Sequence, residues 1–171
     1  MPASTLENTA AHYKKLDMNN QVEIIDYNPA YKQQFDSLNK AWLQKYFTVE
    51  PIDSYVLENP EEAILQHGGA ILFARYEGKV IGTVALKLIE PGVFEMTKMA
   101  VDESYQGIGA GKALCAAAIE KAKAIGADRL ILYSTRVLET AISIYNKLGF
   151  KEIPLEPGVY ERANIKMEYP L

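Results

Sequence analysis

The amino-acid sequence predicts an α/β (α+β) fold in which a mixed, mostly antiparallel sheet of six to seven strands carries helices on both faces. Short runs rich in β-branched residues recur along the chain, and two of them flank a short Gly-containing connection typical of an antiparallel hairpin. Toward the C-terminus such runs alternate with segments of helical periodicity. The chain has 171 residues, 49% of them hydrophobic, which suffices for one compact domain with a buried core.

The first part of the chain divides into a tail, a strand and a helix. Residues 1–20 show no strong period, so we expect an N-terminal tail followed by a single domain over residues 21–171. Residues 21–27 are rich in β-branched side chains and stop at Asn28-Pro29, which predicts a strand and a turn. Large apolar residues then recur at helical spacing as far as Phe47, which predicts a helix.

The middle of the chain is predicted to form a short helix followed by three strands. A helix is expected over residues 60–66, with Asn59 as its N-cap. The runs 70–76 and 80–88 predict a hairpin, and the run 93–101 predicts the next strand.

The last third of the chain alternates between helix and strand patterns. Helices are expected over residues 109–124 and 138–149, and strands over 129–133, 150–153 and 162–169. The helix over 109–124 shows one stripe of apolar or small residues that would let it lie close to a sheet: Ile108, Gly111, Cys115, Ala118, Ala122 and Ile125.

Composition excludes several classes of protein. A formal charge of -4 argues against a nucleic-acid partner, because nucleic-acid binders gather Lys and Arg on a basic face. A single cysteine and two separated histidines give neither a disulfide nor a clustered metal site. No apolar run is long enough to span a bilayer. These features predict a cytoplasmic protein with no membrane partner and no bound metal.

The segment most informative about function follows the strand over 93–101. Here Gln106-Gly-Ile-Gly-Ala-Gly-Lys112 leads from a polar turn into a helix. Free backbone N–H groups at a helix N-terminus attract anions, and glycines let a phosphate approach the backbone. A dinucleotide fingerprint fails because Lys112 stands at the third glycine position, and a P-loop fails because Gln106 and Ala113 stand where a glycine and a hydroxyl residue belong.

Two motifs in this order resemble those of the GNAT superfamily of acyl-coenzyme A dependent N-acyltransferases. The run from Gln106 to Gly111 resembles the family signature [QR]-x-x-G-x-[GA], and residues 140–150 resemble the family segment A-x-x-x-Y-x-x-x-G-F. The resemblance covers residues 70–153 well. It departs from the pattern at Leu138, where many members have an asparagine that contacts the cofactor.

The resemblance implies a GNAT fold and the transfer of an acetyl group from acetyl-CoA to a primary amine in a ternary complex. It places the coenzyme pyrophosphate on the turn and helix start, and it places backbone contacts to the thioester and pantetheine on the preceding strand. The cofactor-binding residues that it implies are Met99, Val101, Gln106, Gly107, Ile108, Gly109, Ala110, Gly111 and Lys112.

Two side chains are candidates for proton transfer. Periodicity alone makes Tyr145 a core aromatic, whereas its motif position resembles that of the family's general acid, which protonates the departing thiolate. Glu95 stands where several family members carry a general-base glutamate, and the alternative for it is an exposed strand carboxylate. Cys115 falls on the apolar stripe and is expected to be buried and inert.

Several questions stay open at this level. Trp42, Tyr46 and Phe47 either line the acceptor pocket or pack in the core. The acceptor is a small-molecule or a peptide amine, and a homodimer through the C-terminal strands is one arrangement for the assembly. A non-catalytic acyl-CoA sensor with the same fold and a nicotinamide-dependent oxidoreductase are the competing functions.

Overall fold

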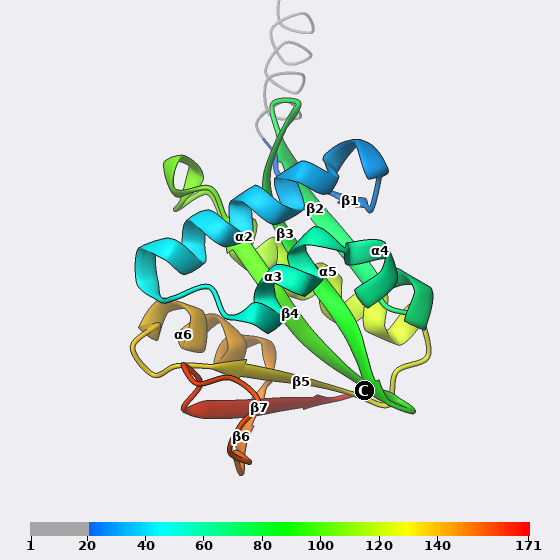
Figure 1. Cartoon of the computed structure of the whole chain (residues 1–171), viewed down its shortest axis with the longest axis vertical. Helices are drawn as coiled ribbons and strands as arrows, with labels where there is room; N and C mark the ends of the chain where they lie inside the picture. Colours follow the sequence, from blue (N-terminus) through cyan, green and yellow to red (C-terminus); the bar gives the residue numbers. More distant parts are fainter. Residues whose placement is uncertain (1–20) are drawn as a thin grey trace, which may run out of the picture.

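The protein folds around one seven-stranded sheet. The structure, a computed structural model, describes residues 21–171, so the predicted N-terminal tail lies outside the described residues. The strands lie in the order β1-β2-β3-β4-β5-β7-β6 (Figure 1). Neighbouring strands pair antiparallel except β4 and β5, which are parallel. The predicted mixed, mostly antiparallel sheet is thus confirmed.

The strands and helices have the following bounds. The strands are β1 (Glu23–Asp26), β2 (Ala70–Tyr76), β3 (Lys79–Glu90), β4 (Val93–Val101), β5 (Arg129–Ser134), β6 (Lys151–Ile153) and β7 (Ile165–Pro170). The helices are α2 (Lys32–Tyr46), α3 (Pro51–Glu58), α4 (Pro60–Ala63), α5 (Ala110–Ala124) and α6 (Glu139–Leu148).

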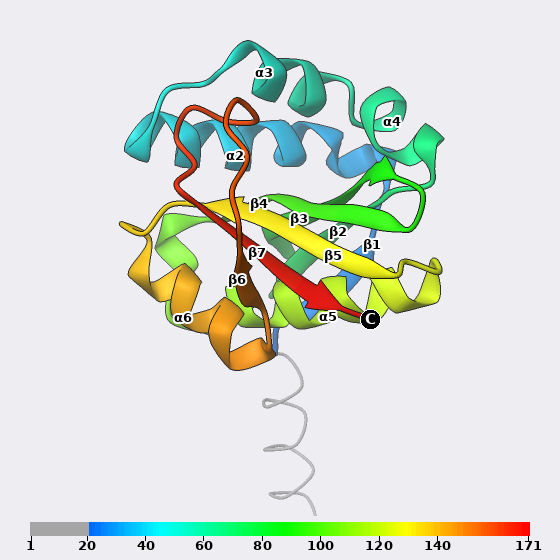
Figure 2. The same ribbon diagram turned by 90° about the horizontal axis from the view of Figure 1, so that it is seen from below.

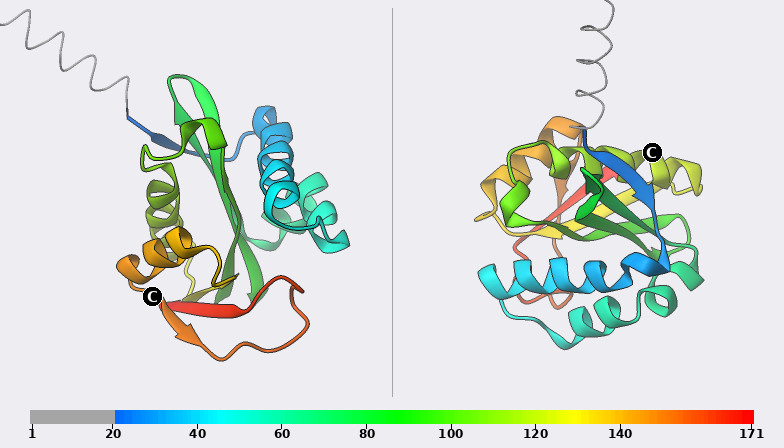
Figure 3. Two further views of the ribbon diagram at one scale, coloured as in Figure 1. Left: turned by 90° about the vertical axis from the view of Figure 1, so that its left-hand side faces the viewer. Right: turned by 90° about the horizontal axis from the view of Figure 1, so that it is seen from above.

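Helices cover both faces of the sheet. Figures 2 and 3 show α2, α3 and α4 on one face and α5 and α6 on the other. Each face buries its own hydrophobic cluster, one including Phe35, Leu57 and Phe73 and the other including Leu114 and Leu130. Because β2 and β3 are covered on both sides, their sequences are continuously apolar rather than alternating.

The segment before β2 differs from the prediction. No helix or strand is predicted for residues 51–58, yet they form α3. Pro51 lies in its first turn, and the Asp53 carboxylate accepts a hydrogen bond of 3.0 Å from the Glu50 N–H. The expected helix over 60–66 is two shorter pieces, α4 and a 3₁₀ turn at Leu65–His67. Asn59 does not cap α4, because its side-chain amide donates to the Tyr55 carbonyl oxygen instead.

The helix α5 buries a stripe that differs from the predicted one at its start. Its buried residues include Cys115, Ala118 and Ala122, as predicted. At the N-terminal end, however, Ile108 is 41% exposed and Gly111 is half-buried. Ala110 and Leu114 are buried in their place, because Ile108 lies in the turn before the helix begins and does not share the helix's periodicity.

The C-terminal strands form the edge of the sheet. β6 pairs only with β7, and β7 begins at Ile165, so the predicted strand over 162–169 starts three residues too early. Arg162 stays outside the sheet because its guanidinium pairs with carboxylates near α3. Within residues 21–171, no helix combines the length and apolar character that crossing a membrane requires.

Candidate active site

The sheet opens between its two parallel strands. β4 and β5 pair only over Val93–Glu95 and Arg129–Ile131, and beyond that point they diverge (Figure 1). β5 stays paired with β7, and β4 stays paired with β3, so the gap lies between β4 and β5 alone. Backbone groups on the facing edges therefore lack the partner that a continuous sheet would give them.

A β-bulge lies in β4 next to this opening. Thr97 pairs with Ala85 and Ala100 pairs with Thr83, so β4 carries one more residue than β3 between these pairs. Lys98, within the bulge, has a φ of 52°, a left-handed conformation that costs free energy for a residue with a side chain. Its ammonium pairs with the Asp53 carboxylate at 2.7 Å.

The bulge is followed by backbone amides directed into the gap. The Asp102 N–H donates to the Ile81 carbonyl oxygen at 2.7 Å, so it points toward β3. Successive residues of a strand direct their N–H groups to opposite sides. The Val101 N–H, and by the same alternation the Met99 N–H, are therefore directed away from β3 and toward the opening.

A cavity of about 750 Å³ occupies the opening. It is lined by residues of α2, β4, the turn before α5, β5, α6 and the connection between β6 and β7. Ten of the predicted catalytic and cofactor residues line it: Glu95, Met99, Val101, Gln106, Gly107, Gly109, Ala110, Gly111, Lys112 and Tyr145. Ile108 does not, because its side chain turns outward to solvent.

The glycine-rich turn leaves room around its backbone. Gly107 and Gly109 each have a φ of 86°, a conformation that side-chain-bearing residues rarely adopt, and Gly109 is the N-cap of α5. A Cβ added at Gly111 would meet no atom within 4 Å, so this face is open. The first intrahelical bond runs from the Ala113 N–H to the Gly109 carbonyl oxygen, which leaves the preceding amides for an anion.

Tyr145 belongs both to the core and to the cavity. Its side chain is 8% exposed and packs edge-on against Phe150, with ring centroids 5.9 Å apart. Burial, and to a lesser degree the neighbouring Cys115, raises the pKa of Tyr145 above its ordinary value. The phenol is thus a protonated group at the cavity wall.

Cys115 is buried, as predicted. Its side chain is fully covered and its thiol lies 3.3 Å from the Met99 sulfur. Burial raises the pKa of the Cys115 thiol to about 12, which makes the reactive thiolate rare at neutral pH.

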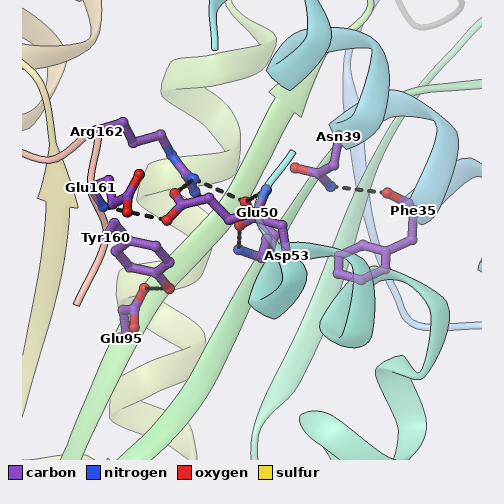
Figure 4. A network of polar contacts seen from close by, with 9 residues as sticks. Phe35, Asn39, Glu50, Asp53, Glu95, Tyr160, Glu161 and Arg162 are labelled. Atoms are coloured by element: carbon purple, nitrogen blue, oxygen red, sulfur yellow. Dashed lines mark hydrogen bonds and ion pairs between the residues drawn. The ribbon is translucent and has the colours of Figure 1, made fainter. Parts of the chain in front are cut away.

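Glu95 is a buried carboxylate rather than an exposed one. It is 3% exposed, and its Oε2 atom accepts a hydrogen bond of 2.8 Å from the Tyr160 hydroxyl (Figure 4). Tyr160 lies in the connection between β6 and β7 and also lines the cavity. Burial, followed by the charge of Glu95, raises the pKa of Tyr160, so this phenol remains a hydrogen-bond donor.

A cluster of charges lies behind Glu95 and joins three parts of the chain. The Arg162 guanidinium bonds both oxygens of Asp53, at 2.9 and 3.0 Å, and also bonds Glu50 (Figure 4). Lys98 bonds the same Asp53. Burial alone raises the pKa of Asp53, but the hydrogen bonds from Arg162 and Lys98 outweigh it and hold the pKa below its ordinary value. Burial lowers the pKa of Lys98, and Asp53 opposes that shift.

Aromatic side chains of α2 and its C-terminal end form a wall of the cavity. The rings of Trp42 and Tyr46 lie 5.6 Å apart, and those of Trp42 and Phe47 lie 5.5 Å apart. All three line the cavity. Trp42 also packs beside the core on this face, whereas Tyr46 is 44% exposed.

The sequence analysis missed four residues of this site, namely Asp53, Lys98, Tyr160 and Arg162. Lys98 could have been identified from the sequence, because a lysine in the middle of an otherwise buried strand needs a partner. The others could not, since Asp53 and Arg162 are 109 residues apart in sequence and only the fold brings them together.

Comparisons with known proteins identify relatives of this chain. The family model described as "Acetyltransferase (GNAT) family" matches residues 32–150, well over half of the chain. The N-acetylaspartate synthetase of Xenopus tropicalis is 34% identical over 103 residues, which are 60% of this chain but only 35% of that protein. The chain thus spans about a third of the length of this relative.

Two solved structures show the same fold. An acetyltransferase of the GNAT family from Staphylococcus aureus superimposes with a TM-score of 0.76 and 24% identity, covering 88% of this chain and 99% of that one. The yncA protein of Salmonella typhimurium, whose structure contains its cofactor acetyl-CoA, gives a TM-score of 0.71 and 18% identity, covering 88% and 94%. At these identities the likeness concerns the fold alone.

Replacing the central carboxylate of the charge cluster is expected to destabilise the protein. Asp53→Asn leaves the buried Lys98 without its carboxylate partner and leaves Arg162 with Glu50 alone, which costs about 3 kcal/mol of the free energy of unfolding. Denaturation with urea measures the loss. Glu23→Gln is the control, because it breaks an exposed pair with Arg75 and is expected to cost less than about 1 kcal/mol.

The same variant has a distinct pH dependence. Because the folded-state pKa of Asp53 is lowered, its ionised carboxylate stabilises the folded protein above the unfolded-state pKa of about 3.9. This stabilisation is lost as the pH falls through the folded-state pKa. The stability gap between the parent protein and Asp53→Asn should therefore narrow below about pH 4. A gap that stays constant from pH 7 to pH 3 contradicts this assignment.

Proposed function

The chain belongs to the GNAT family of acetyltransferases, and from that membership we propose that it transfers an acetyl group from acetyl-CoA to a primary amine in a ternary complex. One observation carries the proposal. The gap between β4 and β5 holds a single cavity that is lined by the glycine-rich turn, by Glu95 and by Tyr145.

The turn before α5 fits the diphosphate of coenzyme A. The glycines at 107, 109 and 111 offer open space beside the backbone, because a Cβ added at any of them would meet no atom within 4 Å. The amides of Ala110, Gly111 and Lys112 lie at the positive end of the α5 dipole. Lys112, an exposed cation that lines the cavity, adds charge for the phosphates.

The strand edge beside the turn fits the acyl arm. The N–H groups of Met99 and Val101 are directed into the gap, so Met99 would donate to the thioester carbonyl and Val101 to the pantetheine arm. A donor aimed at the carbonyl oxygen stabilises the charge that develops there during acyl transfer. Bound in this way, acetyl-CoA supplies an activated acetyl group.

Proton transfer is assigned to two side chains. The nitrogen forms a bond to the acetyl carbon as the carbon–sulfur bond breaks, Glu95 accepts the proton of the amine, and Tyr145 donates a proton to the departing sulfur. Burial raises the pKa of Tyr145, so its phenol holds the proton that it would donate.

The identity of the acceptor is the open part of this function. The similarity to N-acetylaspartate synthetase makes amino acids one class of candidate acceptor, although the similar region covers only part of each chain. A homodimer through the C-terminal strands also remains a prediction.

Acetyl-CoA binding is expected to fail when a carboxylate is placed in the turn. Gly111→Glu should raise the dissociation constant at least about 100-fold, because it opposes the phosphates with like charge at a position where a side chain fits without strain. Isothermal titration calorimetry measures the constant. Ala116→Glu adds the same charge to an exposed position of α5 and should bind normally. Equal affinity in both variants would remove the turn from the binding site.

Tyr145→Phe is expected to lower kcat by about 100-fold or more while the dissociation constant of acetyl-CoA stays the same. The variant loses only the hydroxyl, so the packing against Phe150 is retained. Tyr169→Phe is a matched control, because Tyr169 also packs against Phe150 but does not line the cavity. Full turnover by Tyr145→Phe with the preferred amine rules out the acid role.

Glu95→Gln is expected to lower kcat by about 100-fold or more, since a neutral amide cannot accept the proton of the amine. Steady-state release of free coenzyme A reports the rate. The same substitution at the exposed Glu90 should have no effect. If Glu95→Gln binds acetyl-CoA and turns over normally, Glu95 has no part in the chemistry.

A further inference from the structure

The part of the cavity on the α2 and α3 face of the sheet is called the acceptor end here. Its lining includes Trp42, Tyr46, Phe47, Glu95, Tyr160 and Arg162. Glu95 is separated from the glycine-rich turn by the length of β4 from Glu95 to Val101, whereas Trp42 and Tyr46 also lie beside Val101 and Gln106. Under the proposed function, the amine reaches the acetyl group from this end.

Both cations at the acceptor end are already paired with carboxylates of the chain. Arg162 bonds Asp53 through two nitrogens and also bonds Glu50, and Lys98 bonds Asp53 at 2.7 Å. Their side chains are only 19% and 4% exposed, respectively, so rearrangement toward a ligand would break buried ion pairs. A substrate carboxylate would find no free cation here among residues 21–171.

The charge balance of the acceptor end is negative. Three carboxylates, Glu50, Asp53 and Glu95, stand against two cations, Lys98 and Arg162. Of these five groups, Glu95, Lys98 and Arg162 line the cavity, and the one hydrogen bond that Glu95 accepts within the described residues uses Oε2 and not Oε1. The acceptor end therefore offers an ammonium a free carboxylate oxygen, and it offers a carboxylate only cations that are already paired.

The walls of the acceptor end are aromatic. Trp42, Tyr46 and Phe47 form a cluster of rings on one side, and Tyr160 adds a fourth ring beside Glu95 (Figure 4). Tyr46 leaves 44% of its surface exposed, so apolar area is available for a ligand to cover. Such walls favour an apolar or aromatic body.

We infer, building on the function proposed above, that the acceptor is a primary amine with an aromatic or other apolar body and with no carboxylate next to its amino group. Arylalkylamines are the chemical class that meets these conditions. α-Amino acids, aspartate included, are disfavoured because the acceptor end offers their carboxylates no partner.

The test compares three amines that differ in their carboxylates. Purified full-length protein with acetyl-CoA is given 2-phenylethylamine, L-phenylalanine or L-aspartate, and release of free coenzyme A is followed while mass spectrometry identifies the product. The value of kcat/KM for 2-phenylethylamine should exceed that for L-phenylalanine at least about 100-fold, because the two differ only by a carboxylate that would be buried without a partner. L-Aspartate should give no product.

The outcomes separate this inference from the proposed function. Equal or greater turnover of L-phenylalanine or L-aspartate overturns the inference and leaves the acetyltransferase in place. If none of the three is acetylated, the inference is overturned as well. In that case a wider panel of polyamines and peptide amines decides the proposed function, which falls if acetyl-CoA binds and no amine is acetylated.

Two variants test the wall directly. Tyr46→Ala should raise KM for 2-phenylethylamine about tenfold and leave KM for ethylamine and the dissociation constant of acetyl-CoA unchanged. Tyr55→Ala removes a tyrosine that is 46% exposed and does not line the cavity, so it should change none of these values. Equal effects of Tyr46→Ala on both amines, or no effect at all, contradict an aromatic acceptor wall.

Discussion

The structure depends on the separation of two strands that begin as neighbours. β4 and β5 share only a short parallel ladder before they part, and every feature of the site lies along the gap that results. A sheet does not normally leave backbone groups unpaired in its middle, because burying such groups without hydrogen bonds costs free energy. The gap is stable because its edges are kept apart by other contacts, with β3 holding β4 and β7 holding β5.

The charge cluster around Asp53 ties the two sides of the gap together. It connects the start of α3, the bulge of β4 and the segment before β7, which are remote in sequence. Buried ion pairs add little net stability, because desolvation offsets most of their attraction. Here the ion pairs instead fix the positions of the segments that they join. By holding Arg162 and Lys98, Asp53 fixes the segment that carries Tyr160, and Tyr160 in turn holds the carboxylate of Glu95.

The two ends of the cavity have opposite electrostatic character. At the glycine-rich turn, free amides, the α5 dipole and Lys112 favour anions. At the acceptor end, a buried carboxylate faces the cavity and the nearby cations are neutralised by their own partners. An anionic coenzyme and a cationic amine would therefore sort to opposite ends without competing.

The sequence by itself determined most of the secondary structure, the class of the sheet and the position of the glycine-rich turn. These features depend on local periodicity and on short motifs, which a chain displays without folding. Only the tertiary structure decided the rest. The gap between β4 and β5, the partners of Lys98 and the approach of Tyr160 to Glu95 all join residues far apart in sequence, such as Glu95 and Tyr160, separated by 65 positions. Such contacts are set by how strands order and diverge in space, and no local pattern encodes that geometry.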